Sequence, residues 1–393
     1  MLKIAEKAEA EEFEKLFKGE KGHADLFVAY HQEIIKLNTT VGGYYFNQFL
    51  NLWEEKKKDD FFVRQVADFL DEHICNVLKD IVSDKNKSAK FYELSQILKK
   101  VRGIKHAKNV FEFAKPCLTD NNFNSKLNSI PHLLPIKGGK VIDLKTLKVR
   151  ERTKHDLFSF EINANFDKQK ILGAEKFFSQ LMNNNKDVLD YLQYNLGYMI
   201  TGETKERCLF IFWGSGRNGK STLMNVMKAV LNKLYTTVDK KVFMKTESSS
   251  SHTSHLIPLV GARMAVFSES DKAEKLNEPM IKMLTGNDEI SARQLYGSQF
   301  TFTPVAKFVL LTNHKPTFDT SDLAMLDRVR YIPFLARFTT EPKDGEFKQD
   351  PELVDNLTTK YFDEVFSWLC IGANKFYTSK CKVPKLITDA TND

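Results

Sequence analysis

The sequence predicts an α/β fold with a parallel β-sheet, preceded by a mainly α-helical N-terminal domain. Three observations support this prediction. Apolar residues recur every three or four positions over much of residues 1–115, a spacing typical of helices. From about residue 200 onward, short apolar runs alternate with helical stretches, as in parallel sheets covered on both faces. A glycine-rich stretch, residues 214–221, lies between such a run and a helix, where α/β sheets bind their ligands.

The bulk composition is that of an ordinary globular protein. Apolar residues make up 42% and charged residues 28% of the 393 residues, which argues against extended disorder. The net charge of +7 weakly favours a polyanionic partner. The five cysteines show no C-x-x-C spacing, and no run of about 18 apolar residues occurs. We therefore expect no disulfides, no zinc site, no membrane span and a reducing, cytoplasmic location.

The pattern divides the chain into three predicted parts. Residues 1–165 form a mainly helical domain, in which residues 1–115 read as all-α and a small β element near KVIDL (140–144) closes the domain. Residues 166–340 form the sheet domain with its leading helices, and residues 341–393 form a C-terminal helical segment.

Within the sheet domain the pattern predicts individual elements. Helices are expected over 171–200, 221–232 and near 274–284, and strands over 207–213, 262–268 and 305–312. Two alternating segments on either side of Gly297-Ser298 predict a β-hairpin. Phe300 and Phe302 alternate with threonines in that hairpin, so they are expected in the core.

The stretch GSGRNGKS fits G-x-x-x-x-G-K-[ST], the pattern of a phosphate-binding loop. Its glycines allow backbone N–H groups to turn towards phosphate oxygens, and the following helix offers its positive end. Lys220 is expected to reach the β- and γ-phosphates of ATP, and Ser221 to supply a hydroxyl to Mg²⁺. The alternative is a glycine-rich turn that binds nothing. The predicted ATP-binding residues are Gly214, Ser215, Gly216, Arg217, Asn218, Gly219, Lys220, Ser221 and Thr222.

Two polar side chains follow predicted strands. Glu269 ends the strand over 262–268, where a carboxylate would polarise an attacking water and help to hold the metal; Asp271 is a second candidate. A solvated acid at a strand end is the competing interpretation of Glu269. Asn313 ends the strand over 305–312, where it would orient water against the γ-phosphate.

In their order along the chain, these motifs resemble those of superfamily 3 helicases, specifically the poxvirus-type and phage or plasmid primase-helicases. GSGRNGKS resembles the Walker A motif of that family and MAVFSES its Walker B motif. The stretch IKMLTGNDEISARQLYG is similar to the B-prime segment, VLLTNHKP to motif C, and DRVRYIPF to the segment with the arginine finger. The resemblance runs over roughly residues 110 to 390.

The resemblance implies an AAA+-type ATPase that forms a homo-hexameric ring, moves on single-stranded DNA and unwinds forked DNA during replication. It implies ATP and Mg²⁺ as cofactors, a primase and a replicative polymerase as partners, and a viral or mobile-element origin. The implied catalytic residues are Glu269, Asn313 and Arg328, with Ser221 and Glu269 at the metal. The implied DNA-binding residues near the hairpin turn are Arg293, Gln294 and Tyr296.

Three positions depart from the family pattern. Gly286-Asn287 stands where relatives often have two glycines, although Asn tolerates left-handed backbone angles. Ser268 precedes Glu269 where an acid pair is common. Asp327 precedes Arg328 where two arginines are frequent, so Arg330 is a rival finger and Arg328 is alternatively a surface cation.

Other functions remain open at this point. An origin-binding initiator or loading scaffold would use ATP to assemble on DNA without unwinding it, and a small-molecule phosphotransferase would use the same loop. The basic stretch ILKKVRGIKHAK (97–108) fits either a solvated helix face or a contact with duplex DNA. Related chains often carry a primase domain before this region, so the chain is expected to be part of a longer protein.

Overall fold

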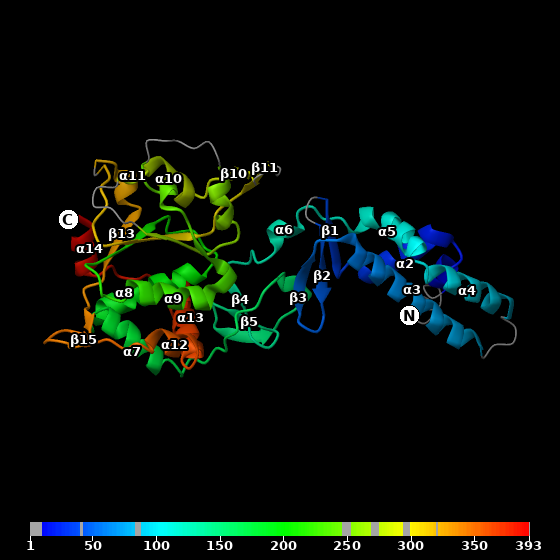
Figure 1. Ribbon diagram of the computed structural model, residues 1–393, viewed down its shortest axis with the longest axis horizontal. Helices are drawn as coiled ribbons and strands as arrows, with labels where there is room; N and C mark the ends of the chain where they lie inside the picture. The colour runs from blue at the N-terminus through cyan, green and yellow to red at the C-terminus, as the bar shows by residue number, and fades with distance from the viewer. Residues whose placement is uncertain are drawn as a thin grey trace. The chain divides into compact units, whose positions relative to one another are not determined.

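The computed structural model describes residues 10–39, 42–82, 88–245, 253–268, 275–293, 299–319 and 321–392. The chain divides into two compact units, which Figure 1 shows as ribbons. The N-terminal unit comprises Met1–Asn128 and Thr153–Ser159, and the C-terminal unit comprises Ser129–Arg152 and Phe160–Asp393. Within the described ranges, no helix combines the length and the apolar character needed to cross a membrane.

The N-terminal unit combines a helical core with a three-stranded antiparallel sheet. Its elements, in order, are α2 (Gly19–His31), β1 (Ile35–Asn38), β2 (Gly42–Asn47), β3 (Leu52–Lys56), α3 (Asp59–Val82), α4 (Ser88–Val101), α5 (Ile104–Leu118), α6 (Phe123–Lys126) and a short 3-10 helix (Lys154–Asp156).

The expectation of an all-α N-terminal region is wrong, because β1, β2 and β3 form a sheet there. These strands have only four to six residues each, too few for an alternating pattern to stand out against the helical spacing around them. At Gly43 in β2, an added Cβ would lie 2.6 Å from side-chain atoms of both Leu37 and Phe62. The sheet therefore packs directly against α3 at a position that admits no side chain.

The C-terminal unit is built on a parallel sheet of five strands in the order β13-β7-β12-β9-β8. The strands of this sheet are β7 (Leu209–Trp213), β8 (Tyr235–Thr237), β9 (Met264–Ser268), β12 (Lys307–Thr312) and β13 (Val329–Pro333). Its helices are α7 (Leu172–Leu181), α8 (Lys186–Ile200), α9 (Lys220–Leu231), α10 (Glu278–Thr285), α11 (Leu323–Leu326), α12 (Leu353–Thr358), α13 (Phe362–Thr378) and α14 (Lys385–Asn392).

Three smaller sheets and three short 3-10 helices complete this unit. The sheets contain β4 (Leu133–Ile136), β5 (Lys140–Asp143) and β6 (Lys148–Glu151), then β10 (Ile290–Arg293) with β11 (Gln299–Phe302), and β14 (Phe338–Thr339) with β15 (Phe347–Lys348). The 3-10 helices are Asn232–Leu234, Lys240–Val242 and Thr253–Leu259.

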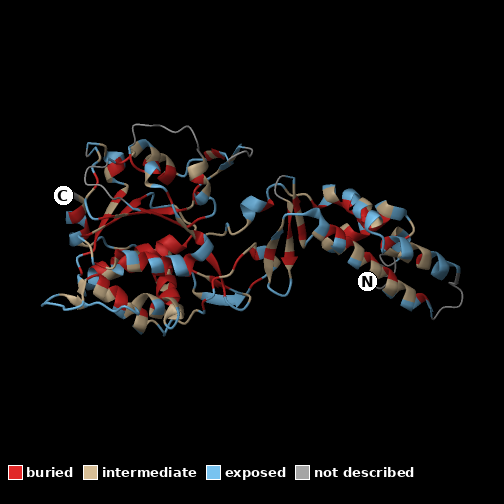
Figure 2. Ribbon diagram, viewed as in Figure 1, coloured by how far each residue is buried: buried red, intermediate tan, exposed pale blue. Residues whose placement is uncertain are grey.

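Alternate residues of the parallel strands enter two different cores, as the period of a strand requires. In β7, Phe210 and Phe212 join the core with α8, α9 and α13, whereas Leu209 and Ile211 join the core with α10. Helices thus cover both faces of the sheet (Figure 1), and Figure 2 shows its strands as largely buried. The expectation of a parallel sheet covered on both faces is confirmed.

The compact units do not follow the three predicted ranges. Sheet β4-β5-β6 lies within 1–165 but belongs to the C-terminal unit, because Ile136 and Ile142 are buried in the same core as α8 and α13. Helix α14 also belongs to this unit and lies along β13, where the Tyr331 N–H donates to Thr391 Oγ1 over 3.3 Å.

The predicted helical stretch 171–200 is divided into α7 and α8. Asn183 and Asn184 adopt positive φ values of 53° and 59°, which Asn tolerates better than most residues. The Asn185 side chain then accepts a hydrogen bond from the Val188 N–H over 3.2 Å and caps α8.

Helices α8 and α13 are in close backbone contact at Gly197, where an added Cβ would lie 2.1 Å from the backbone of Gly372 and Ala373. We predict that Gly197→Ala lowers the free energy of unfolding by about 1–3 kcal/mol through overpacking. Urea denaturation of both proteins measures this change. Helix propensity alone would instead stabilise the variant by up to about 1 kcal/mol, and that result would contradict the packing described here.

Candidate functional site

The glycine-rich loop 214–219 connects the carboxyl end of β7 to the amino end of α9. Gly216 and Gly219 have φ values of 94° and 81°, a region that favours glycine. At Gly214 an added Cβ would lie 2.2 Å from Asn218 Nδ2 and 2.5 Å from the Phe334 carbonyl oxygen. The three glycines are therefore required by the path of the loop and by its close packing.

The ammonium of Lys220 lies inside this loop. It donates hydrogen bonds to the Gly214 carbonyl oxygen at 2.6 Å, to Asn218 Oδ1 at 3.3 Å and to Asn313 Oδ1 at 3.2 Å. Only 7% of Lys220 is exposed, and burial lowers the pKa of its ammonium to about 8. Three neutral oxygens thus surround a cation that has no carboxylate partner among the described residues.

Asn313 directly follows β12, which lies beside β7 in the sheet. Because the strands are parallel, their carboxyl ends meet at one edge, which brings Asn313 to the loop across 93 residues of sequence. The structure therefore brings together two of the residues predicted from separate motifs, Lys220 and Asn313.

Ser221 and Thr222 occupy the first turn of α9. Ser221 is exposed, and Thr222 lines a pocket of about 170 Å³ beside the loop. The walls of this pocket combine apolar side chains with the polar side chains of an arginine, a threonine, a glutamine and an aspartate; they comprise Phe177, Arg217, Gly219, Thr222, Phe338, Gln349, Asp350, Leu353 and Val354.

Residues from the C-terminal part of the chain hold the loop in place, and no sequence motif indicates these residues. The Phe338 N–H donates to the Arg217 carbonyl oxygen over 2.8 Å, and Asn218 Nδ2 donates to the Phe334 carbonyl oxygen over 3.3 Å. These contacts join residues more than 100 positions apart, so no local pattern signals them.

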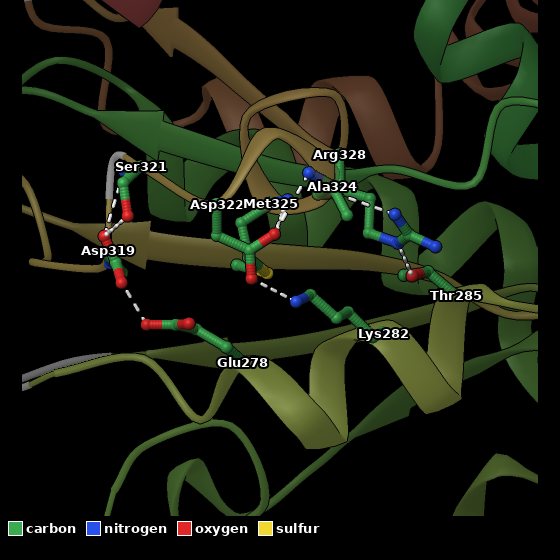
Figure 3. Close-up of polar contacts among 9 residues, drawn as sticks. All are labelled: Glu278, Lys282, Thr285, Asp319, Ser321, Asp322, Ala324, Met325 and Arg328. Atoms are coloured by element: carbon green, nitrogen blue, oxygen red, sulfur yellow. Dashed lines mark hydrogen bonds and ion pairs between the residues drawn. The ribbon is translucent and has the colours of Figure 1, made fainter.

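Arg328 lies at the opposite edge of the sheet, directly before the first residue of β13. Its Nε donates to Thr285 Oγ1 over 3.1 Å, and one terminal nitrogen donates to the Ala324 carbonyl oxygen over 2.7 Å (Figure 3). Five residues of strand at roughly 3.3 Å each place about 16 Å between the two sheet edges. Arg328 therefore cannot reach the Lys220 loop of its own chain.

The surroundings of Arg328 form a polar network between α10 and α11 (Figure 3). Lys282 in α10 forms an ion pair with Asp322, whose carboxylate also caps the start of α11. Glu278 at the start of α10 accepts a hydrogen bond from the Asp319 N–H over 3.0 Å. Helix α10 thus holds the segment that leads to Arg328.

Arg330, the rival finger, has a different environment. It lies within β13 opposite Phe210 of β7. Burial raises the pKa of the Tyr191 and Cys208 side chains, and the positive charge of Arg330 partly offsets that rise. This position is on the face of the sheet covered by α8, because Tyr191 belongs to that helix.

The predicted hairpin is present as the antiparallel pair β10 and β11, in which Arg293 is exposed and lies opposite Gln299. Phe302 packs partly against the core, whereas Phe300 is half-buried and stacks obliquely on Phe302 at 6.0 Å. Asn287 adopts a φ of 69°, so it takes the left-handed angle expected at this departure from the family pattern.

Several predicted residues lie outside the described part of the chain. They are Glu269, Asp271, Gln294, Tyr296, Gly297 and Ser298. Across the described ranges, no group of three His, Cys, Asp or Glu side chains is placed to hold a metal ion.

Two family models match parts of this chain. Residues 24–184 match the family described as D5 N terminal like, and residues 212–328 match a family of unknown function (DUF5906). The second match includes the loop, Lys220 and Asn313, and it ends at Arg328.

The similar curated proteins are viral. Putative helicase L207/L206 of Acanthamoeba polyphaga mimivirus is 28% identical over 78% of this chain and 34% of its own length. Putative helicase 121R of Invertebrate iridescent virus 3 is 25% identical over 67% of this chain and 29% of its own length. Putative primase C962R of African swine fever virus (strain Badajoz 1971 Vero-adapted) is 24% identical over 74% of this chain and 32% of its own length.

The chain is thus similar to putative helicases and primases of large DNA viruses, and part of it matches the D5 N terminal like family. The resemblance inferred from the sequence motifs is thereby confirmed. The chain spans about a third of the length of the curated relatives that it matches. Among solved structures, the apo structure of NrS-1 C terminal region-CTR (A form) aligns over 65% of this chain and 59% of that chain, with 11% identity and a TM-score of 0.44.

Burial lowers the pKa of Lys220 far enough for the change to be measured. We predict that its amine is half-deprotonated at about pH 8, below the ordinary lysine value of 10.5, because burial disfavours the charged form. Competitive acylation over a range of pH, followed by mass spectrometry, measures this value. Asn313→Asp would place a carboxylate beside the amine and raise its pKa. Titration at the ordinary lysine value in the unmodified chain would contradict the burial of this group.

Proposed function

We propose that the chain is the ATP-dependent helicase part of a viral or mobile-element replication protein, which forms a ring and unwinds forked DNA. The observation that carries this proposal is the buried Lys220 ammonium, held by oxygens inside a glycine loop between β7 and α9. A loop of this kind at the carboxyl edge of a parallel sheet is suited to a nucleoside triphosphate. The strand order and the covered sheet are compatible with an AAA+-type fold.

The loop explains how a triphosphate would be held. The Lys220 ammonium would exchange its weak contacts with Asn218 and Asn313 for phosphate oxygens, and the negative phosphates would stabilise its positive charge. The Asn313 amide, freed from the lysine, would orient water against the γ-phosphate. Ser221 and Glu269 would hold Mg²⁺, which would neutralise charge on the phosphates.

The pocket beside Thr222 is suited to the base of the nucleotide. Gly219 ends the loop, Thr222 lies in the first turn of α9, and both line the pocket. A ligand with its phosphates at Lys220 would therefore extend into the pocket. Phe177, Phe338 and Leu353 supply apolar walls for a flat ring.

Arg328 would complete the site of a neighbouring subunit. It lies at the sheet edge away from its own loop and is held there by Thr285. A cation supplied across a subunit seam stabilises charge that develops on the γ-phosphate. This role requires a ring, which the proposal takes to be a homo-hexamer. Arg328 is a better candidate than Arg330, which lies on the α8 face of the sheet.

The hairpin would provide the contact with single-stranded DNA. Arg293 is exposed at the end of β10, and Gln294 and Tyr296 follow it in the sequence. A guanidinium suits a phosphate and an aromatic ring suits a base, so these residue types fit binding without sequence preference. A primase, a replicative polymerase and a cytoplasmic replication site belong to the same proposal, since relatives of this chain are named helicases and primases.

The function is tested by ATP hydrolysis with and without single-stranded DNA, together with strand displacement on a forked duplex. We predict hydrolysis that DNA stimulates, displacement of the annealed strand, and loss of both activities by at least about a hundredfold in Lys220→Ala, because the phosphates lose their buried cation.

The alternatives give different results in the same assay. Stimulation of hydrolysis by DNA without displacement would replace the helicase with a loading scaffold. Hydrolysis or phosphoryl transfer that DNA does not affect would replace it with a phosphotransferase. A Lys220→Arg control retains the positive charge and shows whether the loss in Lys220→Ala reflects charge alone.

A further inference from the structure

A cluster of five cations lies at the junction of α4 and α5 in the N-terminal unit, and the proposed ATPase does not use it. The cluster, called here the basic corner, comprises Lys99, Lys100, Arg102, Lys105 and Lys108. All five side chains are exposed. They fall within ten consecutive residues around Gly103, where one helix ends and the next begins.

The charge of the basic corner is largely uncompensated. From residue 94 to residue 111 the chain contains no Asp or Glu. Arg102 pairs with Asp71 over 2.5 Å, but within the described ranges the four lysines form no ion pair. The nearby acid Glu20 is 3.7 Å from His106 Nδ1 and accepts a hydrogen bond from Asn109. Among these described residues, Glu20 forms no ion pair with any of the four lysines.

Helix stability does not explain all of these lysines. Lys99 and Lys100 lie in the last turn of α4, where cations are favourable beside the negative end of the helix dipole. Lys105 lies in the first turn of α5, at the positive end of that helix's own dipole, where a cation is unfavourable and where no acidic residue is present. The charge of Lys105 therefore does not stabilise α5.

We infer that the basic corner binds the phosphate backbone of duplex DNA without reading its sequence. Dense and exposed positive charge is the feature that gives sequence-independent affinity for a duplex. Residues 99–108 contain no Phe, Tyr or Trp, the side chains on which unpaired bases commonly stack. This composition favours a duplex over a single strand. The N-terminal unit would thereby hold double-stranded DNA, a role distinct from that of the hairpin.

The test is the affinity of the full chain for a labelled, blunt-ended DNA duplex, measured by fluorescence anisotropy at several salt concentrations. The corner variant is Lys99→Gln, Lys100→Gln, Lys105→Gln and Lys108→Gln. Glutamine removes the charge and has a helix propensity close to that of lysine. The control variant removes four exposed lysines of the C-terminal unit, Lys168→Gln, Lys170→Gln, Lys186→Gln and Lys233→Gln.

We expect the corner variant to bind the duplex at least about tenfold more weakly at low salt. Its slope of log affinity against log salt should become shallower by about 3 to 4, since each lost phosphate contact contributes about 0.9. The control variant should keep both the affinity and the slope, although its net charge changes equally. The single variant Lys105→Gln should make the slope shallower by about 0.9, the contribution of one phosphate contact. Because it changes only one side chain, it shows the effect with little risk of a folding defect.

Equal duplex binding by the corner variant and the wild-type chain would overturn the inference. So would weakening of the control variant to the same extent, because net charge would then explain the effect. So would a corner variant that loses more affinity for an RNA duplex, a single strand or an acidic protein than for the DNA duplex. None of these outcomes depends on ATP turnover, so the proposed helicase and the basic corner can fail separately.

Discussion

The constraint on which the proposed chemistry depends is the direction of the strands in the parallel sheet. Because β7, β12 and β13 run the same way, Lys220 and Asn313 meet at the carboxyl edge while Arg328 lies at the amino edge. The separation of about 16 Å follows from the length of a five-residue strand. One chain therefore holds Lys220 at the edge where we propose that the phosphates bind, and it holds Arg328 at the other edge, out of reach of its own loop.

The rest of the C-terminal unit keeps these two edges in position. At the carboxyl edge, the segment after β13 packs on the glycine loop through Phe334 and Phe338, so the loop depends on residues far along the chain. At the amino edge, Thr285 ends α10 and accepts a hydrogen bond from Arg328. The same helix leads into β10, so the proposed DNA hairpin and the arginine share one support.

The features that the sequence predicts correctly are those that depend on neighbouring residues. The glycine loop and the strand ending at Asn313 are local patterns, and the structure joins them because parallel strands end at one edge. The short strands β1 to β3 carry too few residues for a visible period. The support of the loop by Phe338 and the link from Arg328 to Thr285 join distant residues, so only the folded chain reveals them.

The central claim, that Arg328 acts on the nucleotide of another subunit, is tested most directly by mixing two inactive variants. Lys220→Ala lacks the loop cation and Arg328→Ala lacks the finger, so each assembly alone should hydrolyse ATP poorly. Mixed assemblies contain seams with an intact Lys220 facing an intact Arg328. We therefore expect ATP hydrolysis to return as the two variants approach equal proportions. Hydrolysis by the Arg328→Ala assembly at the wild-type rate, or no recovery in mixed assemblies that do form, would contradict it.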